Sequence, residues 1–147
     1  RITPEGYPHH ISSEWATPHR ADRIAELLGA REKHSLDSFR TLQADHRSNA
    51  VREILPLLIE AHRKAEAGRA RAMPERVREV IGALAAFDAT MATDRPEPLI
   101  ATAWVRELTR LVYADELGPE LFAAYWDQRQ VFLMAVLSGR DGADAWC

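Results

Sequence analysis

Apolar residues recur three or four positions apart along most of the chain, which is the period of an α-helix with one buried face. No segment alternates apolar and polar residues as a half-buried strand does, and no internal repeat appears. Residues 131–137 alone would suit a buried strand, but the helical spacing begins well before them. The pattern predicts an all-α fold of five to seven helices in an orthogonal or irregular bundle. The apolar stretches are 24–28, 36–58, 77–87, 99–112 and 121–136.

Local signals predict where the first two helices begin and end. Thr17 offers an N-cap oxygen, and Pro18 suits the first helical position because its missing N–H costs nothing there. Gly29 is a typical residue for ending a helix. Ser35 is expected to cap the helix that follows.

Further signals predict interruptions later in the chain. Pro56 removes one backbone donor, so we expect a kink or break near it. Residues 65–74 and 88–98 contain small, charged and turn-forming residues and are predicted to be connectors. The Leu-Gly-Pro sequence at 117–119 is expected to end one helix and start another.

The chain is predicted to divide into an N-terminal segment and one helical domain. Residues 1–16 contain prolines and a glycine without an apolar period, so we expect an extended, loosely held segment. Residues 17–147 are expected to form the helical domain, because this length suits one domain with its own core. We also expect Arg1 and residues 146–147 to be cuts through a longer polypeptide.

Composition and charge argue against several classes of protein. Hydrophobic residues make up 46% and charged residues 28% of the chain, as in an ordinary globular protein. The net charge of −3 gives no support to binding of nucleic acid or of an anionic membrane. The longest apolar run, 131–137, is far shorter than the ~20 residues of a membrane-spanning helix. No signal peptide is expected within the chain, and the single cysteine, Cys147, cannot form an internal disulfide.

The usual catalytic and metal-binding motifs are incomplete in this sequence. The histidines at positions 9, 10, 19, 34, 46 and 62 lack the i,i+4 pairing with an acid that a zinc helix uses, so surface or partly buried histidines are expected. There is no Gly-rich phosphate loop and no Gly-x-Ser-x-Gly turn. Asp37, Asp45 and His46 could pair with a Ser, but one helix cannot fold its own neighbours into a triad.

Ordinary structure explains the remaining polar and aromatic groups. A basic cluster is interleaved with glutamates, which favours a solvated helix face over a nucleic-acid patch. Four aromatic residues are expected in the core rather than around a ligand. Gln43 and Asp45 lie opposite an apolar face and are either exposed or anchor a neighbouring loop by hydrogen bonds. The basic cluster is His62, Arg63, Lys64, Arg69, Arg71, Arg76 and Arg78, and the aromatic residues are Trp104, Tyr125, Trp126 and Phe132.

Three longer stretches and the closing Trp-Cys carry a resemblance to a known family. They read YPHHISSEWATPHRADRIAELL (7–28), KHSLDSFRTLQADHRSNAVREILPLL (33–58) and LAAFDATMATDRPEPLIATAWVRELTRLVYADELG (84–118). Together, and in this order, they resemble the helical part of the β chain in the penicillin acylase (penicillin amidase) family of N-terminal-nucleophile hydrolases. The resemblance covers nearly the whole chain. One departure is the Phe-Asp-Ala at 87–89, where the family commonly has Trp-Asp-Gly.

The resemblance implies that the chain belongs to a longer amide hydrolase made as a precursor, here called the parent protein, and is inactive by itself. In that family, self-cleavage frees an N-terminal Ser whose hydroxyl attacks the substrate amide. Its own α-amino group, with a pKa of about 7.7–8.0, acts as the base. Backbone N–H groups and an Asn amide hold the oxyanion. The resemblance places this Ser and this Asn outside the chain, with the Asn shortly before Arg1.

Arg20 is the candidate site residue within the chain. Its spacing from Trp15 matches a Trp and an Arg near the active site of the family, which implies a supporting catalytic role in the parent protein only. The Arg would orient the oxyanion Asn and adjust the electrostatics around the nucleophile. A guanidinium suits this role because it is always charged and presents a planar fork of donors. From position alone, an ion pair with a carboxylate such as Glu14 is the alternative.

The resemblance also implies partners, cofactors and location. The partners would be the remainder of the acylase α and β chains and a small-molecule acyl amide, either a β-lactam side-chain amide or an N-acyl-homoserine lactone, with no nucleic acid and no membrane. No cofactor is expected in this chain. In some members of the family, a carboxylate near the segment that matches Tyr7-Pro8 contributes to a calcium site. Here that segment is followed by His9, His10 and Ile11, so no calcium is expected in this chain, and calcium is possible in the parent protein. The parent protein is expected to be periplasmic or secreted.

A different class of function remains open from the sequence. The chain would then be a helical ligand-binding or assembly module without enzymatic activity, such as the ligand-binding bundle of a regulator. No helix-turn-helix reader or basic stripe supports this alternative.

Overall fold

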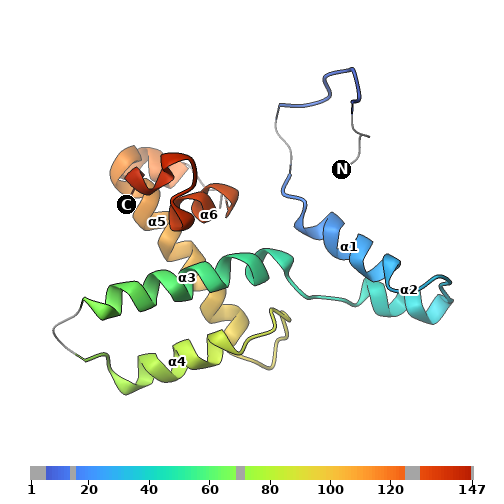
Figure 1. Ribbon diagram of the computed structural model, residues 1–147, viewed down its shortest axis with the longest axis horizontal. Coiled ribbons are helices and arrows are strands. Elements are labelled where there is room, and N and C mark those ends of the chain that lie inside the picture. Colours follow the sequence, from blue (N-terminus) through green and yellow to red (C-terminus); the bar gives the residue numbers. More distant parts are fainter. Residues whose placement is uncertain (1–5, 14–15, 69–71, 125–129, 147) are drawn as a thin grey trace.

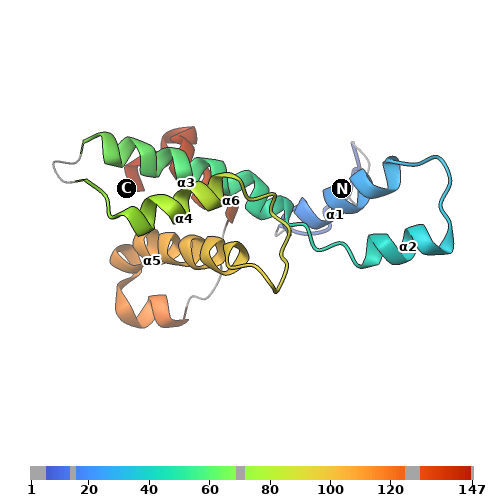
Figure 2. The ribbon, with the colours of Figure 1, turned by 90° about the horizontal axis from the view of Figure 1, so that it is seen from below.

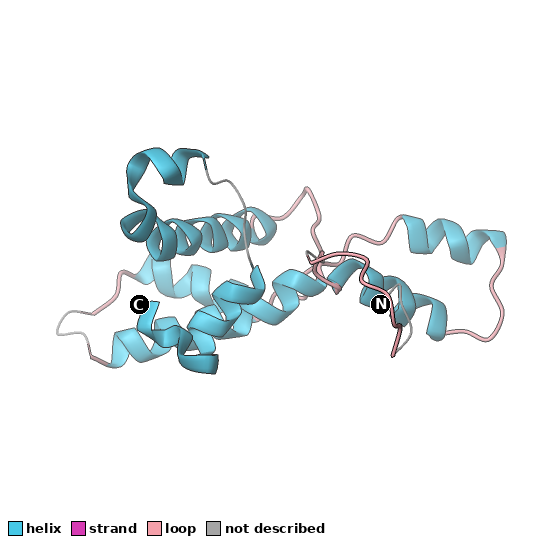
Figure 3. Ribbon diagram, turned by 90° about the horizontal axis from the view of Figure 1, so that it is seen from above, coloured by secondary structure: helices cyan, strands magenta, loops and turns pink. Residues whose placement is uncertain are grey.

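The computed structural model describes residues 6–13, 16–68, 72–124 and 130–146. In this part of the chain, helices account for all regular elements and no strand forms, which confirms the all-α prediction (Figure 3). The elements are α1 (His19–Gly29), α2 (Leu36–Gln43), α3 (Asn49–Ala67), α4 (Glu75–Ala85), α5 (Glu97–Ala124), α6 (Gln130–Ser138) and a 3-10 helix, η1 (Arg140–Trp146).

Helices α3 to α6 form the body of the molecule, and α3 packs against α4, α5 and α6 (Figure 1). Neighbouring residues of α3 face two different clusters of buried side chains. Ile54 and Leu58 join the cluster shared with α5 and α6, which includes the fully buried Leu133. Leu55 joins a second cluster with Leu84 of α4. Burial of one such side chain stabilises the fold by about 1.5–3 kcal/mol, so α3 holds the body together from the centre.

Trp104 and Phe132, the two predicted core aromatics that the structure describes, pack against this core, as predicted. Trp104 packs against both clusters, and its ring lies edge-on to His62 at 6.1 Å between centroids. Phe132 lies 5.7 Å from the Tyr113 ring and 5.2 Å from the Trp146 ring. The predictions for Tyr125 and Trp126 fall outside the described residues.

Helices α1 and α2 project from the body as an arm, defined here as residues 19–43 (Figure 2). The arm joins the body through contacts of α1 with α3, whereas α2 contacts the other helices sparsely. Ser35 caps α2 as predicted, because its Oγ accepts a hydrogen bond from Ser38 N at 3.2 Å and Ser38 Oγ accepts one from Ser35 N at 2.9 Å.

The ends of α1 differ from the prediction. The helix begins at His19 with Pro18 in the N-cap position, so Thr17 lies one residue too early to cap it. Proline carries no side-chain acceptor, and the first turn has no side-chain cap. At the other end, α1 includes Gly29 and Ala30 is the C-cap. Gly29 does not adopt a positive φ, so the left-handed termination expected there does not form.

The predicted break near Pro56 does not occur, and the chain is interrupted between Gln43 and Asn49 instead. Helix α3 continues through Pro56 because Leu55 is buried beside it and Pro56 itself is exposed. A proline deprives only one carbonyl of its helical partner, here that of Arg52 on the exposed side.

The other predicted interruptions occur with shifted limits. Gly118 has φ 71° and ψ 166°, so the helix kinks there and resumes at Pro119, as predicted. The connectors at 65–74 and 88–98 lie between helices, although α3 extends to Ala67 and α5 begins at Glu97. The division of the chain after residue 16 stays a prediction.

Candidate functional site

An open hollow of about 590 Å³ lies between α1 and the stretch that joins α2 to α3, and it contains the predicted site residue. Ile24, Leu27 and Leu42 give it an apolar wall. Its polar lining combines basic and neutral side chains, and Asp45 is the acid among the described lining residues. The cationic and titratable basic side chains are His19, Arg20, Arg23, His46 and Arg47.

The firmest contact of the hollow joins Arg23 of α1 to Asp45. Arg23 Nε donates to Asp45 Oδ2 at 2.9 Å and Arg23 Nη2 donates to Asp45 Oδ1 at 2.7 Å. The third guanidinium nitrogen, Nη1, lies 3.0 Å from Glu26 Oε1. The two side chains are only 15% and 19% exposed. Asp45 is therefore an anchor as expected, but it holds helix α1 rather than a neighbouring loop, whereas Gln43 is exposed.

This ion pair shifts the pKa values of its members in opposite directions. The hydrogen bonds from Arg23 hold the pKa of Asp45 below its ordinary value, and those from Asp45 raise the pKa of Arg23. The pKa of Glu26 is also lowered, first by its contact with Arg23. All three groups are therefore charged at neutral pH, and the charge of Arg23 is engaged in a structural ion pair.

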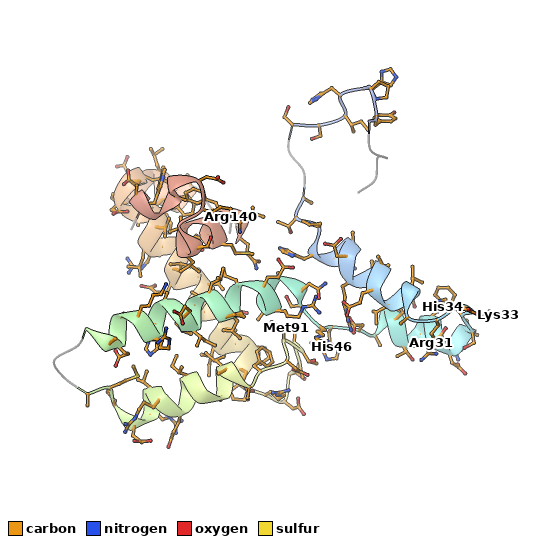
Figure 4. All side chains as sticks on the ribbon, in the orientation of Figure 1. Arg31, Lys33, His34, His46, Met91 and Arg140 are labelled. Carbon is orange, nitrogen blue, oxygen red and sulfur yellow. The ribbon has the colours of Figure 1, made fainter. Side chains whose placement is uncertain are left out.

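The stretch before α3 is held by the loop that joins α4 to α5. Ser48 N donates to Ala89 O at 2.8 Å, and Met91 N donates to His46 O at 3.1 Å. Figure 4 shows His46 and Met91 next to each other beside the start of α3. The Arg47 side chain adds a hydrogen bond from Nε to Asp88 O at 3.0 Å. These bonds fix the position of Asp45 relative to α1.

The departure from the family's Trp-Asp-Gly falls at this support. Ala89 is 1% exposed and has φ 63°, in the left-handed region that suits glycine. Asp88 stabilises the turn because its Oδ1 accepts from Thr90 N at 3.0 Å. Phe87 is buried and its ring lies 5.3 Å from the Arg95 guanidinium carbon. Ala89 thus adopts the left-handed backbone conformation that a glycine would adopt with less strain.

Arg20 lies on α1 at the edge of the hollow and is exposed. Within the part of the chain that the structure describes, no hydrogen bond or ion pair engages its side chain. Trp15 and Glu14, its predicted neighbours, lie outside the described residues. The structure thus separates two arginines three residues apart: Arg23 is fixed by Asp45, and Arg20 is exposed and forms no ion pair with a described residue.

A buried asparagine and a half-buried histidine complete the lining. Asn49 is only 4% exposed, and its Oδ1 has no hydrogen-bond partner among the described residues. The His19 side chain is 11% exposed, and its Nδ1 lies 3.5 Å from Glu53 Oε1, which is an ion pair only when the ring is protonated. The hollow therefore contains a buried acceptor in need of a donor.

The structure brings none of the other candidate groups into a catalytic arrangement. Asp37 pairs with Arg40 of its own helix at 2.8 Å. His46 Nδ1 lies 3.0 Å from Ala44 O, and Asp45 is taken by Arg23. The triad that the sequence left open is thus not assembled from Asp37, Asp45 and His46.

The basic cluster is a solvated helix face, as predicted. Arg63 Nη2 lies 2.8 Å from Glu60 Oε1, and Lys64 Nζ lies 3.8 Å from the same oxygen. Arg78 pairs with Glu75 on α4. Among the described members of the cluster, the arginines and Lys64 pair with glutamates of their own helix and form no continuous basic surface for nucleic acid. Arg69 and Arg71 lie outside the described residues.

No metal site is found in the described part of the chain, where no three His, Cys, Asp or Glu side chains converge. The segment after Tyr7 does not fit calcium, which prefers oxygen ligands. It offers the imidazoles of His9 and His10, and His10 Nε2 lies 3.4 Å from Ser13 Oγ. Among the helices that the structure describes, none is both long and apolar enough to cross a bilayer.

Sequence reasoning missed Arg23 as a residue of the site. Arg20 and Arg23 precede the same apolar stripe, and no local signal distinguishes them. A carboxylate 22 residues away decides which arginine is fixed, and that is a tertiary contact. The one available signal was Asp45, already identified as a possible anchor without a named partner.

Curated proteins match the chain over nearly its whole length. Acyl-homoserine lactone acylase QuiP of Pseudomonas aeruginosa is 31% identical over 162 aligned residues, which cover 99% of this chain and 18% of that protein. The QuiP proteins of Pseudomonas fluorescens and Pseudomonas putida are 29% and 26% identical, and in each case the alignment covers 99% of this chain and 19% of the relative. The chain thus spans less than a fifth of the length of these relatives.

No solved structure gives a significant match to the chain. The profile of the penicillin amidase family matches residues 1–147, the full extent of the chain. The resemblance seen in the sequence is therefore confirmed, and the chain belongs to the penicillin amidase family.

Proposed function

We propose that this chain is the helical part of a parent protein that hydrolyses acyl amides, and that its substrate is an N-acyl-homoserine lactone. The observation that carries the proposal is the family match over residues 1–147, because the relatives aligned along the chain are named acyl-homoserine lactone acylases. A β-lactam side-chain amide is the second substrate class to test, since the family takes its name from penicillin.

The proposed reaction follows the chemistry that the family resemblance implies. The Ser hydroxyl oxygen adds to the amide carbonyl carbon, and the α-amino group of that Ser accepts the hydroxyl proton. The C–N bond then breaks as the proton passes to the leaving amine of the homoserine lactone. Water hydrolyses the acyl-Ser ester and releases the carboxylic acid. This Ser and the oxyanion Asn are proposed to lie in the remainder of the parent protein, so the chain alone is inactive.

Arg20 is the proposed contribution of this chain to the reaction. Its exposure in the lining of the hollow supports the proposal, because an exposed guanidinium is accessible to groups elsewhere in the parent protein. A guanidinium beside the oxyanion Asn would orient the amide and favour negative charge on the carbonyl oxygen. Arg23, fixed by Asp45, would keep α1 in place beneath it.

The complete open reading frame that contains residues 1–147 provides the test. The purified protein is incubated with N-acyl-homoserine lactones of several chain lengths and with a phenylacetyl amide, and released amine is quantified. We expect amine release from an acyl-homoserine lactone, with an N-terminal Ser on one processed chain by protein sequencing. The Ser→Ala variant and the isolated 147-residue chain serve as controls and should release no amine above a heat-denatured sample.

Two results would contradict this proposal. A reading frame that adjoins a DNA-binding domain would favour the helical binding module instead. Processed protein that binds acyl-homoserine lactone without cleaving any amide would support a ligand-binding role. The location of the parent protein outside the cytoplasm, and calcium within it, stay predictions.

A further inference from the structure

Both helices of the arm lack a buried residue, unlike every helix of the body. Each still has an apolar side. On α1, Ile24 is 40% exposed and Leu28 is 38% exposed. On α2, Leu36 is 69% exposed and Phe39 is 45% exposed. Large apolar side chains on two successive helices of the arm are therefore exposed to solvent, and Figure 2 shows both helices standing away from the body.

Neither helix is expected to persist on its own. They have 11 and 8 residues, and isolated helices shorter than about 12–15 residues are marginal in water. The two helices hardly contact each other, so they do not cover each other's apolar sides. A helix of this length is normally stabilised by packing of its apolar face, which points to a missing partner surface.

The hollow beside the arm lacks polar partners as well. The buried Asn49 Oδ1 has no donor among the described residues, although buried polar groups are nearly always satisfied. Arg20, at the same hollow, carries a charge that no described carboxylate neutralises. A partner that covers the arm would supply the donor for Asn49 and the acceptor for Arg20 that the described residues do not provide.

We infer that the arm and its hollow form the surface on which the remainder of the parent protein docks. The partner segment combines an apolar surface for Ile24, Leu28, Leu36 and Phe39 with a carbonyl or carboxylate at Arg20. This inference rests on the proposed function in one respect, because it takes the chain to be part of a longer acylase. The relatives have more than four fifths of their length outside the matched region, which supplies such a segment.

The geometry disfavours the other occupants. A small molecule needs a pocket that encloses most of its surface, whereas the apolar residues here spread over two helices that hardly touch. A second copy of the chain would have to compete with a segment of the same polypeptide, which acts at a high effective concentration. The covalently connected segment is therefore the occupant to which the inference commits.

Amide hydrogen exchange of the complete reading frame and of the isolated 147-residue chain tests the inference. Peptides from residues 19–43 should exchange at least about tenfold more slowly in the complete protein, because docking suppresses local opening. Peptides from residues 97–113 of α5, already packed in the body, serve as the internal reference and should change little. Equal exchange of the arm in both proteins would overturn the inference.

Matched variants locate the docking surface. Leu36→Ser changes an arm residue that is 69% exposed, and Leu99→Ser changes a body residue that is 74% exposed. In the complete protein, Leu36→Ser should restore fast exchange to the arm and lower the melting temperature, while Leu99→Ser leaves both unchanged. Identical effects of the two substitutions would overturn the assignment to the arm. If Leu36→Ser does not accumulate as folded protein, the exchange comparison between the unsubstituted complete protein and the isolated chain still tests the inference.

Three further outcomes would also count against the inference. Arm protection that rises with the concentration of the isolated chain would identify a second copy as the occupant. Protection of the isolated chain by an N-acyl-homoserine lactone would identify a small-molecule site. A reading frame that contains little beyond residues 1–147 would remove the proposed partner. An inactive complete protein with a protected arm would refute the proposed function and keep the docking surface.

Discussion

Arg23 and Asp45 form a two-point ion pair across 22 residues of sequence, with N–O distances of 2.9 and 2.7 Å, which fastens α1 to the stretch that precedes α3. A pair in which both side chains are more than four fifths buried differs from a solvated pair, because removal of one partner leaves a charge in a partly dry site. The pair therefore matters for stability as well as for the placement of α1.

Arg23→Met is expected to lower the free energy of unfolding of the chain by about 1–3 kcal/mol, between the values for exposed and buried pairs. Urea denaturation followed by circular dichroism measures this. The matched control is Arg40→Met, which breaks an ion pair at 2.8 Å whose side chains are 69% and 86% exposed. That variant should change stability by less than about 0.5 kcal/mol. Similar losses in the two variants would show that burial of the Arg23 pair carries no extra weight.

The lowered pKa of Asp45 predicts a dependence of stability on pH. Its carboxyl takes up a proton at a higher pH in the unfolded chain than in the folded chain, so the stabilisation is complete above the ordinary aspartate pKa of about 3.9. The stabilisation is lost as the pH falls through the lower folded value. The stability difference between the wild type and Asp45→Asn should thus stay constant from about pH 7 to pH 5 and shrink below about pH 4. A difference that grows on acidification would have the wrong sign.

The helices of the body were predictable because their signal is local. The apolar residues of α4 and of the first part of α5 repeat every three or four positions, and a chain with that pattern gains most by burying one face. The kink at Gly118 was also local, since Gly-Pro ends a helix in most contexts.

The interruption before α3 and the choice of Arg23 were not predictable in this way. The interruption depends on the bond from Ser48 N to Ala89 O, between residues 41 positions apart. Pro56 gave the stronger local signal, but burial of Leu55 and Leu58 outweighs the loss of one hydrogen bond. Arg20 and Arg23 have similar local surroundings, and only the position of Asp45 in space separates them.

Two glycines in open surroundings provide a test of the kink in α5. A Cβ on Gly118 or on Gly82 would meet no atom within 4 Å, so the two sites differ in backbone conformation and not in space. Gly118→Ala should destabilise the chain by about 1–3 kcal/mol, because φ 71° with ψ 166° is accessible essentially only to glycine. Gly82→Ala, within α4, should stabilise it by about 0.5–1 kcal/mol. Thermal denaturation of both variants measures these changes in stability. A Gly118→Ala variant as stable as the wild type would mean that the kink relaxes at no cost in free energy.

Substitution of Arg20 is expected to have different effects in the isolated chain and in the parent protein. In the chain it is exposed and has no described ion-pair partner, so Arg20→Leu should change the free energy of unfolding by less than about 1 kcal/mol. In the parent protein the same substitution should lower kcat by about 10²–10³-fold, as expected for the loss of one donor near an oxyanion. Arg20→Lys should recover only part of the activity, since an ammonium cannot reproduce the planar fork of donors.

The measurement for Arg20 is a pair of experiments on one substitution. Steady-state kinetics of the complete protein are compared with urea denaturation of the 147-residue chain, both carrying Arg20→Leu. Arg23→Met is the matched control, because its partner is known and its main expected effect is on stability. A large fall in kcat with unchanged stability assigns Arg20 to the reaction, since an arginine that only supports the fold would change both together. If kcat is unchanged while the chain loses several kcal/mol, Arg20 is a structural ion-pair residue, and its pairing with a carboxylate such as Glu14 becomes the better explanation.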